Sequence, residues 1–426
     1  MANEDNLIIE SIKTIARTRG VKYDYVIDSL VEAIKSGVRK KFGKGTESDV
    51  SVNKSTGEIK IALIKKVVEE VKDPDKEISL QEALTKKECK VGDEIRIPVA
   101  ISELGRTAIE SVKQALTQRI SEAERNRIMG EYEKKLGEIV KGIIKVVSRN
   151  EVLVDLGPVE ATITKNGLIS TEHYRLDSPI RAVVAAVERS QWGPRIILSR
   201  TDPKFLERLL YYEIPEIKEG LIQIVKTVRN PGVRAKVAVQ TIDPKIDPVG
   251  ACVGYRGSRI QSIVKELSGE KIDVIQWSKD LNLLVSRALS PAKVKDVVVV
   301  SEGNIIAVVP DEDYSKAIGK NGVNVELASR LTGVHIEIKK ASEYEKEIQE
   351  KILAETKIEN VEGLSKELKK LLIEKGYTNV LSVLKATPDE LKLLLSLDDA
   401  GVDELLAKLK PKEEKEEPVE NAPEGS

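Results

Sequence analysis

Cysteine, histidine and aromatic residues are all scarce in this sequence. The 426 residues include two cysteines, Cys89 and Cys252, and two histidines, His173 and His335, none in a metal-ligand spacing. We therefore expect no structural zinc site, and the low cysteine content fits a reducing cytoplasm. Aromatic side chains make up 3% of the chain, which argues against base stacking as the main mode of nucleic-acid binding.

Long apolar runs and an excess of one charge are missing as well. No segment has the apolar length of a membrane span and no signal-peptide pattern opens the chain, so we expect no membrane association. Lys and Arg number 69 against 70 Asp and Glu, a net charge of −1, so any nucleic-acid surface must be local. There is also no Ser/His/Asp or Cys/His set, no Walker-type loop and no carboxylate pair at a glycine-rich strand end. We therefore expect no enzymatic activity, metal or cofactor.

Residues 1–130 have the pattern of an α+β domain. Apolar residues at helical spacing predict a helix over residues 23–42, which Gly43 ends. The run "SDVSVNKSTGEIKIALI" alternates around a Ser-Thr-Gly turn and predicts a β-hairpin. A charged helix from Arg106 to about Gly130 should follow. Its length of roughly 35 Å lets it carry one domain's core at one end and project another domain from the other.

Residues 137–200 change to short β-rich runs separated by turns. Five strands in about 65 residues predict a small closed barrel of the OB type. OB surfaces usually hold bases on aromatic rings, but the only aromatic side chains here are His173, Tyr174 and Trp192. This favours a barrel that mainly positions its neighbours over one that binds RNA itself.

Residues 201–345 contain an internal repeat. The order α-β-β-α-α-β is predicted over residues 201–281 and again over residues 282–345, here called the first and second repeats. Each repeat has a glycine pair at the same helix–helix joint, Gly254/Gly257 and Gly319/Gly322. Chance supplies roughly two G-x-x-G matches in a chain of this composition, so the pairs alone indicate nothing. The recurrence of the whole pattern indicates a duplicated domain.

A glycine pair at such a joint can bring phosphate groups close to the main chain. Glycine has no Cβ to hold a nucleic-acid backbone away, and the following helix presents free N–H groups and the positive end of its dipole. The residues inside the pairs, Tyr255 and Arg256 or Lys320 and Asn321, should point toward phosphate or sugar. This is the chemistry of the type II KH module, whose loop clamps four nucleotides of single strand. The alternative is a turn whose glycines serve conformation only.

A basic hairpin in the first repeat adds candidate contacts. Lys and Arg outnumber Asp and Glu by 15 to 11 over residues 201–293, and Arg229, Arg234 and Lys236 lie on one predicted hairpin. The alternative is a set of charges that protects a solvated sheet edge. The residues expected to face RNA are Gly254, Tyr255, Arg256, Gly257, Arg259, Gly319, Lys320, Asn321, Gly322, Arg229, Arg234 and Lys236.

The helix over residues 23–42 ends in a basic cluster of Lys35, Arg39, Lys40 and Lys41. Basic residues complement the carboxyl end of a helix, and that is the simplest explanation. Four in seven residues exceed what a helix end needs, so contact with nucleic acid or an acidic partner is the competing interpretation.

The last part of the chain looks helical and then acidic. Residues 350–410 have a helical pattern, with Thr387, Pro388 and Glu390 forming a good helix start. Residues 411–426 hold six Glu against two Lys, with three Pro. We expect a disordered acidic tail there.

Several runs are long and specific enough to point to a known family. They are "GRTAIESVKQAL", "VLVDLG", "IILSRTDPKFLERLL", "RNPGVRAKVAVQTIDPKIDPVGACVGYRGSRIQSIVKELSGEKIDVIQW" and "AIGKNGVNVELASRLTGVHIEI". With the predicted domain order, they resemble the bacterial NusA family of transcription termination and antitermination proteins over most of residues 1–345. The expected fold is an amino-terminal α+β domain, an S1-type OB barrel, two type II KH domains and a helical module.

The resemblance implies a non-enzymatic factor that binds core RNA polymerase near the RNA exit channel and modulates pausing, termination and antitermination. It implies that both repeats hold nascent single-stranded RNA on one continuous surface. The amino-terminal domain should contact the polymerase and the exiting RNA, and Lys35, Arg39, Lys40, Lys41 and Arg106 are the residues we assign to that role. Other termination or antitermination factors are further expected partners, and we expect a monomer.

Two departures from the family pattern leave alternatives open. The barrel lacks most stacking aromatics. The helical module resembles a helix-hairpin-helix at "VEGLSKEL", but "SLDDAGVDELL" replaces the second glycine hairpin. A protein-binding or autoinhibitory role for residues 350–410 is therefore as well supported as nucleic-acid contact, and the acidic tail could compete with RNA. For the whole chain, the competing function is an RNA-binding adaptor of ribosome assembly or RNA decay; an exoribonuclease would need an acidic metal site, which we do not find.

Overall fold

The computed structural model describes residues 2–191, 193–395 and 397–409, so Trp192 and the acidic tail over residues 411–426 lie outside the described residues. The chain forms two compact parts, residues 1–209 and 210–426. Among the described residues, no helix combines the length and the apolar character that crossing a membrane requires.

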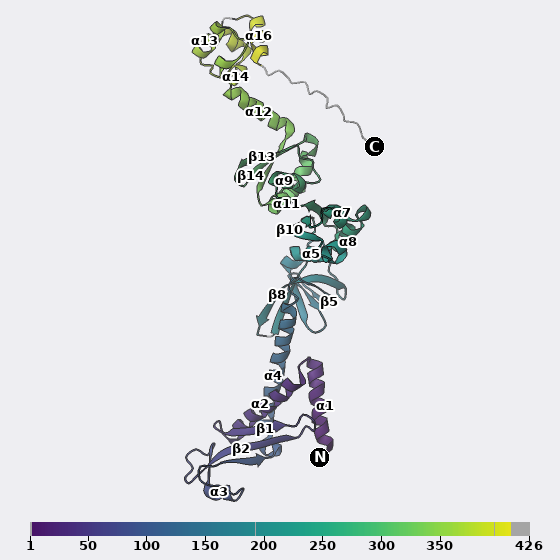
Figure 1. Ribbon diagram of the computed structural model, residues 1–426, viewed down its shortest axis with the longest axis vertical. Helices are drawn as coiled ribbons and strands as arrows, with labels where there is room; N and C mark the ends of the chain where they lie inside the picture. Colours follow the sequence, from purple (N-terminus) through teal and green to yellow (C-terminus); the bar gives the residue numbers. More distant parts are fainter. Residues whose placement is uncertain (1, 192, 396, 410–426) are drawn as a thin grey trace. The chain divides into compact units, whose positions relative to one another are not determined.

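The amino-terminal domain packs two helices on a four-stranded sheet (Figure 1). Its elements are α1 (Ala2–Arg19), α2 (Tyr23–Phe42), β1 (Glu47–Val52), β2 (Ile59–Val68), β3 (Glu77–Ser79), α3 (Leu80–Leu84), β4 (Glu94–Val99), η1 (Ile101–Leu104) and α4 (Gly105–Glu133). The predicted helix over residues 23–42, the hairpin and the long charged helix are all confirmed. The helix α1 was not among the predicted elements. Gly37 of α2 lies so close to α4 that a Cβ there would be 2.6 Å from Cγ2 of Val112.

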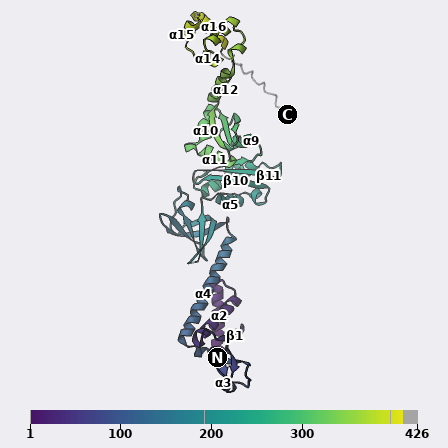
Figure 2. The ribbon, with the colours of Figure 1, turned by 90° about the vertical axis from the view of Figure 1, so that its left-hand side faces the viewer.

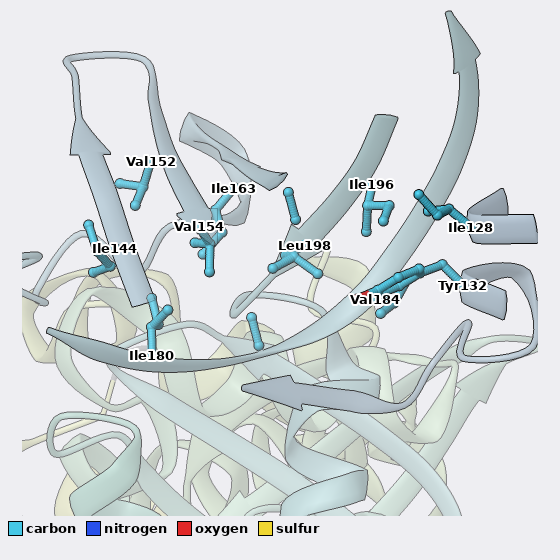
Figure 3. Packing of buried hydrophobic residues seen from close by; sticks show 12 residues of the cluster. Ile128, Tyr132, Ile144, Val152, Val154, Ile163, Ile180, Val184, Ile196 and Leu198 are labelled. Carbon is cyan, nitrogen blue, oxygen red and sulfur yellow. The ribbon is translucent and has the colours of Figure 1, made fainter. Parts of the chain in front are cut away.

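The predicted barrel of the OB type is confirmed. The strands β5 (Ile139–Val147), β6 (Glu151–Asp155), β7 (Glu160–Thr164), β8 (Pro179–Ser190) and β9 (Gly193–Ser199) close in the order β5-β6-β7-β9-β8, with the turn η2 (Lys165–Gly167) after β7. Ile128 and Tyr132 of α4 belong to the barrel's apolar core and lie beside Val184 and Ile196 (Figure 3). The helix α4 therefore contributes to the core of the amino-terminal domain at one end and to that of the barrel at the other.

Both repeats have the predicted αββααβ order. The first contains α5 (Pro203–Glu213), α6 (Pro215–Lys218), β10 (Ile222–Asn230), β11 (Arg234–Thr241), α7 (Pro248–Val253), η3 (Tyr255–Gly257), α8 (Ser258–Glu266) and β12 (Lys271–Gln276). The second contains α9 (Leu281–Ala288), β13 (Asp296–Ser301), β14 (Asn304–Val309), η4 (Asp311–Asp313), α10 (Tyr314–Ile318), η5 (Lys320–Gly322), α11 (Val323–Thr332) and β15 (His335–Lys340). In each sheet the central strand pairs antiparallel with one neighbour and parallel with the other.

The two repeats share one apolar core. Val228 and Ala238 of the first sheet pack in the same buried cluster as Leu327 and Ala328 of α11, and both views place α11 beside β10 (Figures 1 and 2). A hydrogen bond of 3.2 Å from Nη1 of Arg330 to the carbonyl of Arg229 crosses the same contact. The contact covers the face of the first sheet that its own helices leave open.

The carboxyl-terminal module is helical, as predicted. It consists of α12 (Ala341–Glu355), η6 (Ile358–Asn360), α13 (Lys366–Glu374), α14 (Val380–Leu384), α15 (Pro388–Leu395) and α16 (Asp399–Leu409) around one apolar core. The predicted start at Thr387 is a reciprocal cap. The Thr387 amide donates to Glu390 over 3.0 Å and the Glu390 amide donates to the Thr387 hydroxyl over 3.4 Å.

Candidate nucleic-acid interface

The two glycine pairs adopt the same backbone conformation. The first glycines, Gly254 and Gly319, have φ/ψ angles of 75°/174° and 75°/171°, in a region that only glycine occupies readily. The second glycines, Gly257 and Gly322, have angles of 77°/12° and 77°/4°, in the left-handed region. Because two different sequences reach one geometry, the loop shape belongs to the repeat and not to the residues inside it.

The first glycine of each pair is also required by close packing within the chain. A Cβ on Gly254 would lie 2.7 Å from Cγ of Arg259, and one on Gly319 would lie 2.8 Å from Cβ of Asn324. The second glycines differ in this respect. Around Gly257 the nearest atom would be 3.9 Å away, and around Gly322 no atom lies within 4 Å.

The residues inside the pairs face solvent. Tyr255 is 79% exposed, and the Arg256 guanidinium lies over its ring at 5.3 Å from the centroid. Lys320 and Asn321 of the second loop are exposed as well. Within the described part of the chain, no carboxylate pairs with Arg256 or Lys320, so both charges are available to an anion. Behind each loop a helix begins, α8 or α11, whose first N–H groups and dipole favour negative charge.

Two of the predicted RNA contacts must be corrected, because their charges are buried. Arg229 is 3% exposed and donates to both carboxylate oxygens of Glu270 at 2.8 Å. Lys236 is 0% exposed, with Nζ 2.9 Å from Oδ2 of Asp273 and 3.0 Å from the carbonyl of Ser290. Burial lowers the pKa of the Lys236 ammonium, against the opposing effect of Asp273. The second repeat covers Lys236, whereas Arg229 is buried against Glu270 of its own repeat. The pattern of one strand reveals neither partner.

Two further predicted contacts are held on acidic partners. Arg234 pairs with Asp273 at 2.6 Å. Arg259 places Nη1 2.9 Å and 3.0 Å from the carboxylate oxygens of Glu216 and 2.7 Å from the carbonyl of Ala251. The Arg259 side chain thus lies against the loop from within and does not extend from it.

The predicted polymerase-facing residues lie on adjoining helix ends. Nζ of Lys40 is 2.5 Å from Oγ of Ser111 on α4, which brings the end of α2 beside the start of α4, where Arg106 is exposed. Arg39 and Lys41 are exposed on α2.

Lys35 is held differently. It donates to Glu32 over 3.0 Å, and this hydrogen bond is the main cause that lowers the pKa of Glu32. Arg119, which was not predicted, also lies near Glu32 and lowers that pKa further. Nothing in the spacing of α4 marks Arg119 in advance.

Among the described residues of the barrel, Tyr174 offers little stacking surface. Tyr174 is partly buried, and its hydroxyl donates to Glu172 over 2.7 Å and accepts from the Ile169 amide over 3.0 Å. Burial and the Glu172 carboxylate raise the pKa of Tyr174. His173 is exposed. Direct RNA contact by the barrel therefore finds less support than contact by the two repeats.

The barrel, the duplicated αββααβ fold and the matched glycine loops define a multidomain KH protein, the class whose G-x-x-G loop takes single-stranded nucleic acid. Family models match three stretches of the chain. Residues 8–126 match the NusA N-terminal domain, residues 200–277 the NusA-like first KH domain and residues 281–346 the NusA-like second KH domain. The chain belongs to the NusA family.

Relatives of known name agree with the family models. The transcription termination/antitermination protein NusA of Thermus thermophilus is 41% identical over 346 residues, which cover 78% of this chain and 89% of that one. The proteins of the same name from Rickettsia conorii and Bacillus subtilis are 37% and 38% identical. They match over 96% and 80% of this chain and over 81% and 95% of their own lengths.

Proposed function

We propose that this chain is a non-enzymatic, cytoplasmic elongation factor that binds RNA polymerase and nascent single-stranded RNA and modulates pausing, termination and antitermination. Relatives that carry the name transcription termination/antitermination protein, at 41% identity and below, support the biological role. The observation that carries the RNA-binding role is the pair of glycine loops with one backbone conformation, on two repeats that share a core.

The proposal divides the work among the domains. Residues 1–130 bind the polymerase, with Arg39, Lys40, Lys41 and Arg106 at the contact. Residues 137–200 form the S1 barrel, and residues 201–281 and 282–345 hold RNA. In the two loops, backbone N–H groups take phosphate, and Arg256 and Lys320, which pair with no carboxylate among the described residues, supply positive charge.

Binding to single-stranded RNA tests the second half of the proposal. With four nucleotides per loop, the footprint should be about eight or more nucleotides. Affinity should fall with salt by about 0.7 log units per log unit for each phosphate contacted. Duplex RNA of the same sequence serves as the control, and equal affinity for the duplex would contradict a single-strand clamp.

Binding to the polymerase separates the proposal from its alternative. The full chain should co-purify with core RNA polymerase, and a variant with Arg39→Glu and Lys41→Glu should not. A variant with Lys245→Glu and Lys271→Glu, which reverses two exposed charges of the first repeat, is the matched control. A chain that binds RNA but never the polymerase would instead be an RNA adaptor of ribosome assembly or decay.

A further inference from the structure

The position two residues after each second glycine performs the same task in both repeats with different chemistry. In the first repeat it is Arg259, whose Nη1 donates to the carbonyl of Ala251 over 2.7 Å. In the second repeat it is Asn324, whose Nδ2 donates to the carbonyls of Lys316 and Ala317 over 3.3 Å and 3.0 Å. Ala251 and Lys316 each stand three residues before the first glycine, so the two bonds are equivalent.

These hydrogen bonds join the helix before each loop to the helix after it. The last carbonyls of a helix have no partner within it, and α7 and α10 both end at the first glycine. A side chain at the start of the following helix donates to one of these carbonyls and so links the two helices across the glycine pair. We call this link the tie. Because an arginine and a neutral asparagine both do this, the shared property is hydrogen-bond donation, and positive charge is not needed.

Each tie reaches a third helix outside the loop. Arg259 is bound by Glu216 of α6, with both carboxylate oxygens within 3.0 Å of Nη1. Asn324 is 0% exposed, and its Nδ2 also donates to the carbonyl of Leu289, the residue that caps α9, over 3.0 Å. A buried asparagine cannot reach RNA, so the equivalent position in the first repeat need not do so either.

We propose that Arg259 and Asn324 are positioning residues that hold the two loops ready for RNA without touching it, and that Glu216 is part of the first tie. The inference rests on RNA binding by these loops and adds to it how the loops are kept in shape. A loop ordered in advance loses less conformational entropy when it binds, so loss of the tie should weaken RNA binding by about tenfold.

The substitution Glu216→Gln gives opposite results for positioning and for direct contact. If Arg259 touched phosphate, removing its acidic partner would free the guanidinium and strengthen RNA binding. If Arg259 positions the loop, the same change loosens it and weakens binding. Glu219→Gln is the matched control, because it removes the same charge from an exposed residue three positions along the chain. The measurement is fluorescence anisotropy of the full chain with a labelled single-stranded RNA.

The salt dependence of binding gives a second readout, which separates the loss of a phosphate contact from the loss of loop positioning. Arg259→Gln should lower RNA affinity and leave the log–log salt slope unchanged, because no phosphate contact is lost. Direct contact would reduce the slope by about 0.7. Arg259→Lys, which keeps a donor at the end of the side chain, should restore part of the affinity. Circular dichroism confirms that each variant is folded.

Hydrogen exchange of the loop amides, measured without RNA, keeps the inference distinct from the proposed function. Exchange over Tyr255–Gly257 should be faster in Glu216→Gln and unchanged in Glu219→Gln. Unchanged exchange in Glu216→Gln, or stronger RNA binding by it, would overturn the positioning role even if the wild-type chain binds RNA. Faster exchange in a chain that fails to bind RNA would uphold the tie and overturn the proposed function.

Discussion

Placing a carboxylate at the second glycine of each loop should abolish RNA binding while leaving the chain folded. The double variant Gly257→Asp and Gly322→Asp adds side chains where there is room, with no atom closer than 3.9 Å to either new Cβ. Both positions are left-handed, at φ of 77°, which Asp and Asn tolerate better than other L-residues. The first glycines are poorer targets, because a Cβ on Gly254 would strike Arg259.

The size of the effect follows from Coulomb's law. A carboxylate about 5 Å from a phosphate is repelled by about 1 kcal/mol in water and about 3 kcal/mol at the effective dielectric of a protein surface. Each loop should therefore lose roughly 5- to 150-fold in affinity, and the pair should lose the product if both loops bind one RNA. The fold should lose about 1–2 kcal/mol per substituted glycine at most.

The assay is anisotropy with single-stranded RNA at fixed salt, and the control is the double variant Gly257→Asn and Gly322→Asn. Asparagine has the shape of aspartate and the same backbone preference but carries no charge. We expect the Asn variant to keep most of the wild-type affinity and the Asp variant to lose nearly all of it. Equal affinities for the two variants would refute the idea that phosphates lie against these loops.

Three further predictions concern the scaffold. Gly37→Ala should destabilise the chain in urea by up to about 2 kcal/mol, because the new Cβ would lie 2.6 Å from Cγ2 of Val112 and this strain outweighs a gain in helix propensity of about 1 kcal/mol. The control is Gly130→Ala in α4, where no atom lies within 4 Å of the new Cβ, and it should stabilise the chain by about 0.5–1 kcal/mol. Burial raises the pKa of the Cys252 thiol to about 12, so thiol reagents at pH 8 should modify Cys252 only after unfolding, and rapid modification in the native chain would contradict its burial. A hydrogen bond from the Lys316 side chain and another from the Lys293 amide lower the pKa of Asp313 in the folded chain. The ionised Asp313 therefore stabilises the fold above its pKa in the unfolded chain, and this stabilisation is lost as pH falls through its pKa in the folded chain. The melting temperature of Asp313→Asn should lie below that of the wild type at pH 7 and converge with it near pH 2.

Features governed by neighbours in sequence were predictable here. The helix over roughly residues 23–42 was predicted correctly, because its apolar spacing and Gly43 act locally. The cap at Thr387 and the order of elements in both repeats are local in the same sense. The glycine loops were found because the repeat supplied two copies of one context.

Features governed by packing were not predictable. Arg229 and Lys236 lie on a strand pair whose alternation is compatible with a solvated face. In the structure Arg229 is buried on Glu270 of its own repeat, and Lys236 is buried beside the carbonyl of Ser290 in the second repeat. Arg259 stands beside a predicted RNA loop, so sequence reasoning assigned it to RNA. Its actual partners, Glu216 and the carbonyl of Ala251, lie 43 and 8 positions away in the chain. A charged side chain pairs with the partner that the tertiary fold brings near it, and the sequence does not show which partner that is.

The length of helix α4 determines which of its faces meets the amino-terminal core and which meets the barrel core. Because one continuous helix supplies Ala108 to the amino-terminal core and Ile128 and Tyr132 to the barrel core, each residue added between them would turn the barrel-facing side by about 100° and shift it by about 1.5 Å. A single insertion there would remove Tyr132 from the barrel even though every residue of both domains remained. An insertion of seven residues would nearly restore the phase, within about 20°. In this part of the chain the number of residues is therefore under a constraint separate from their identity.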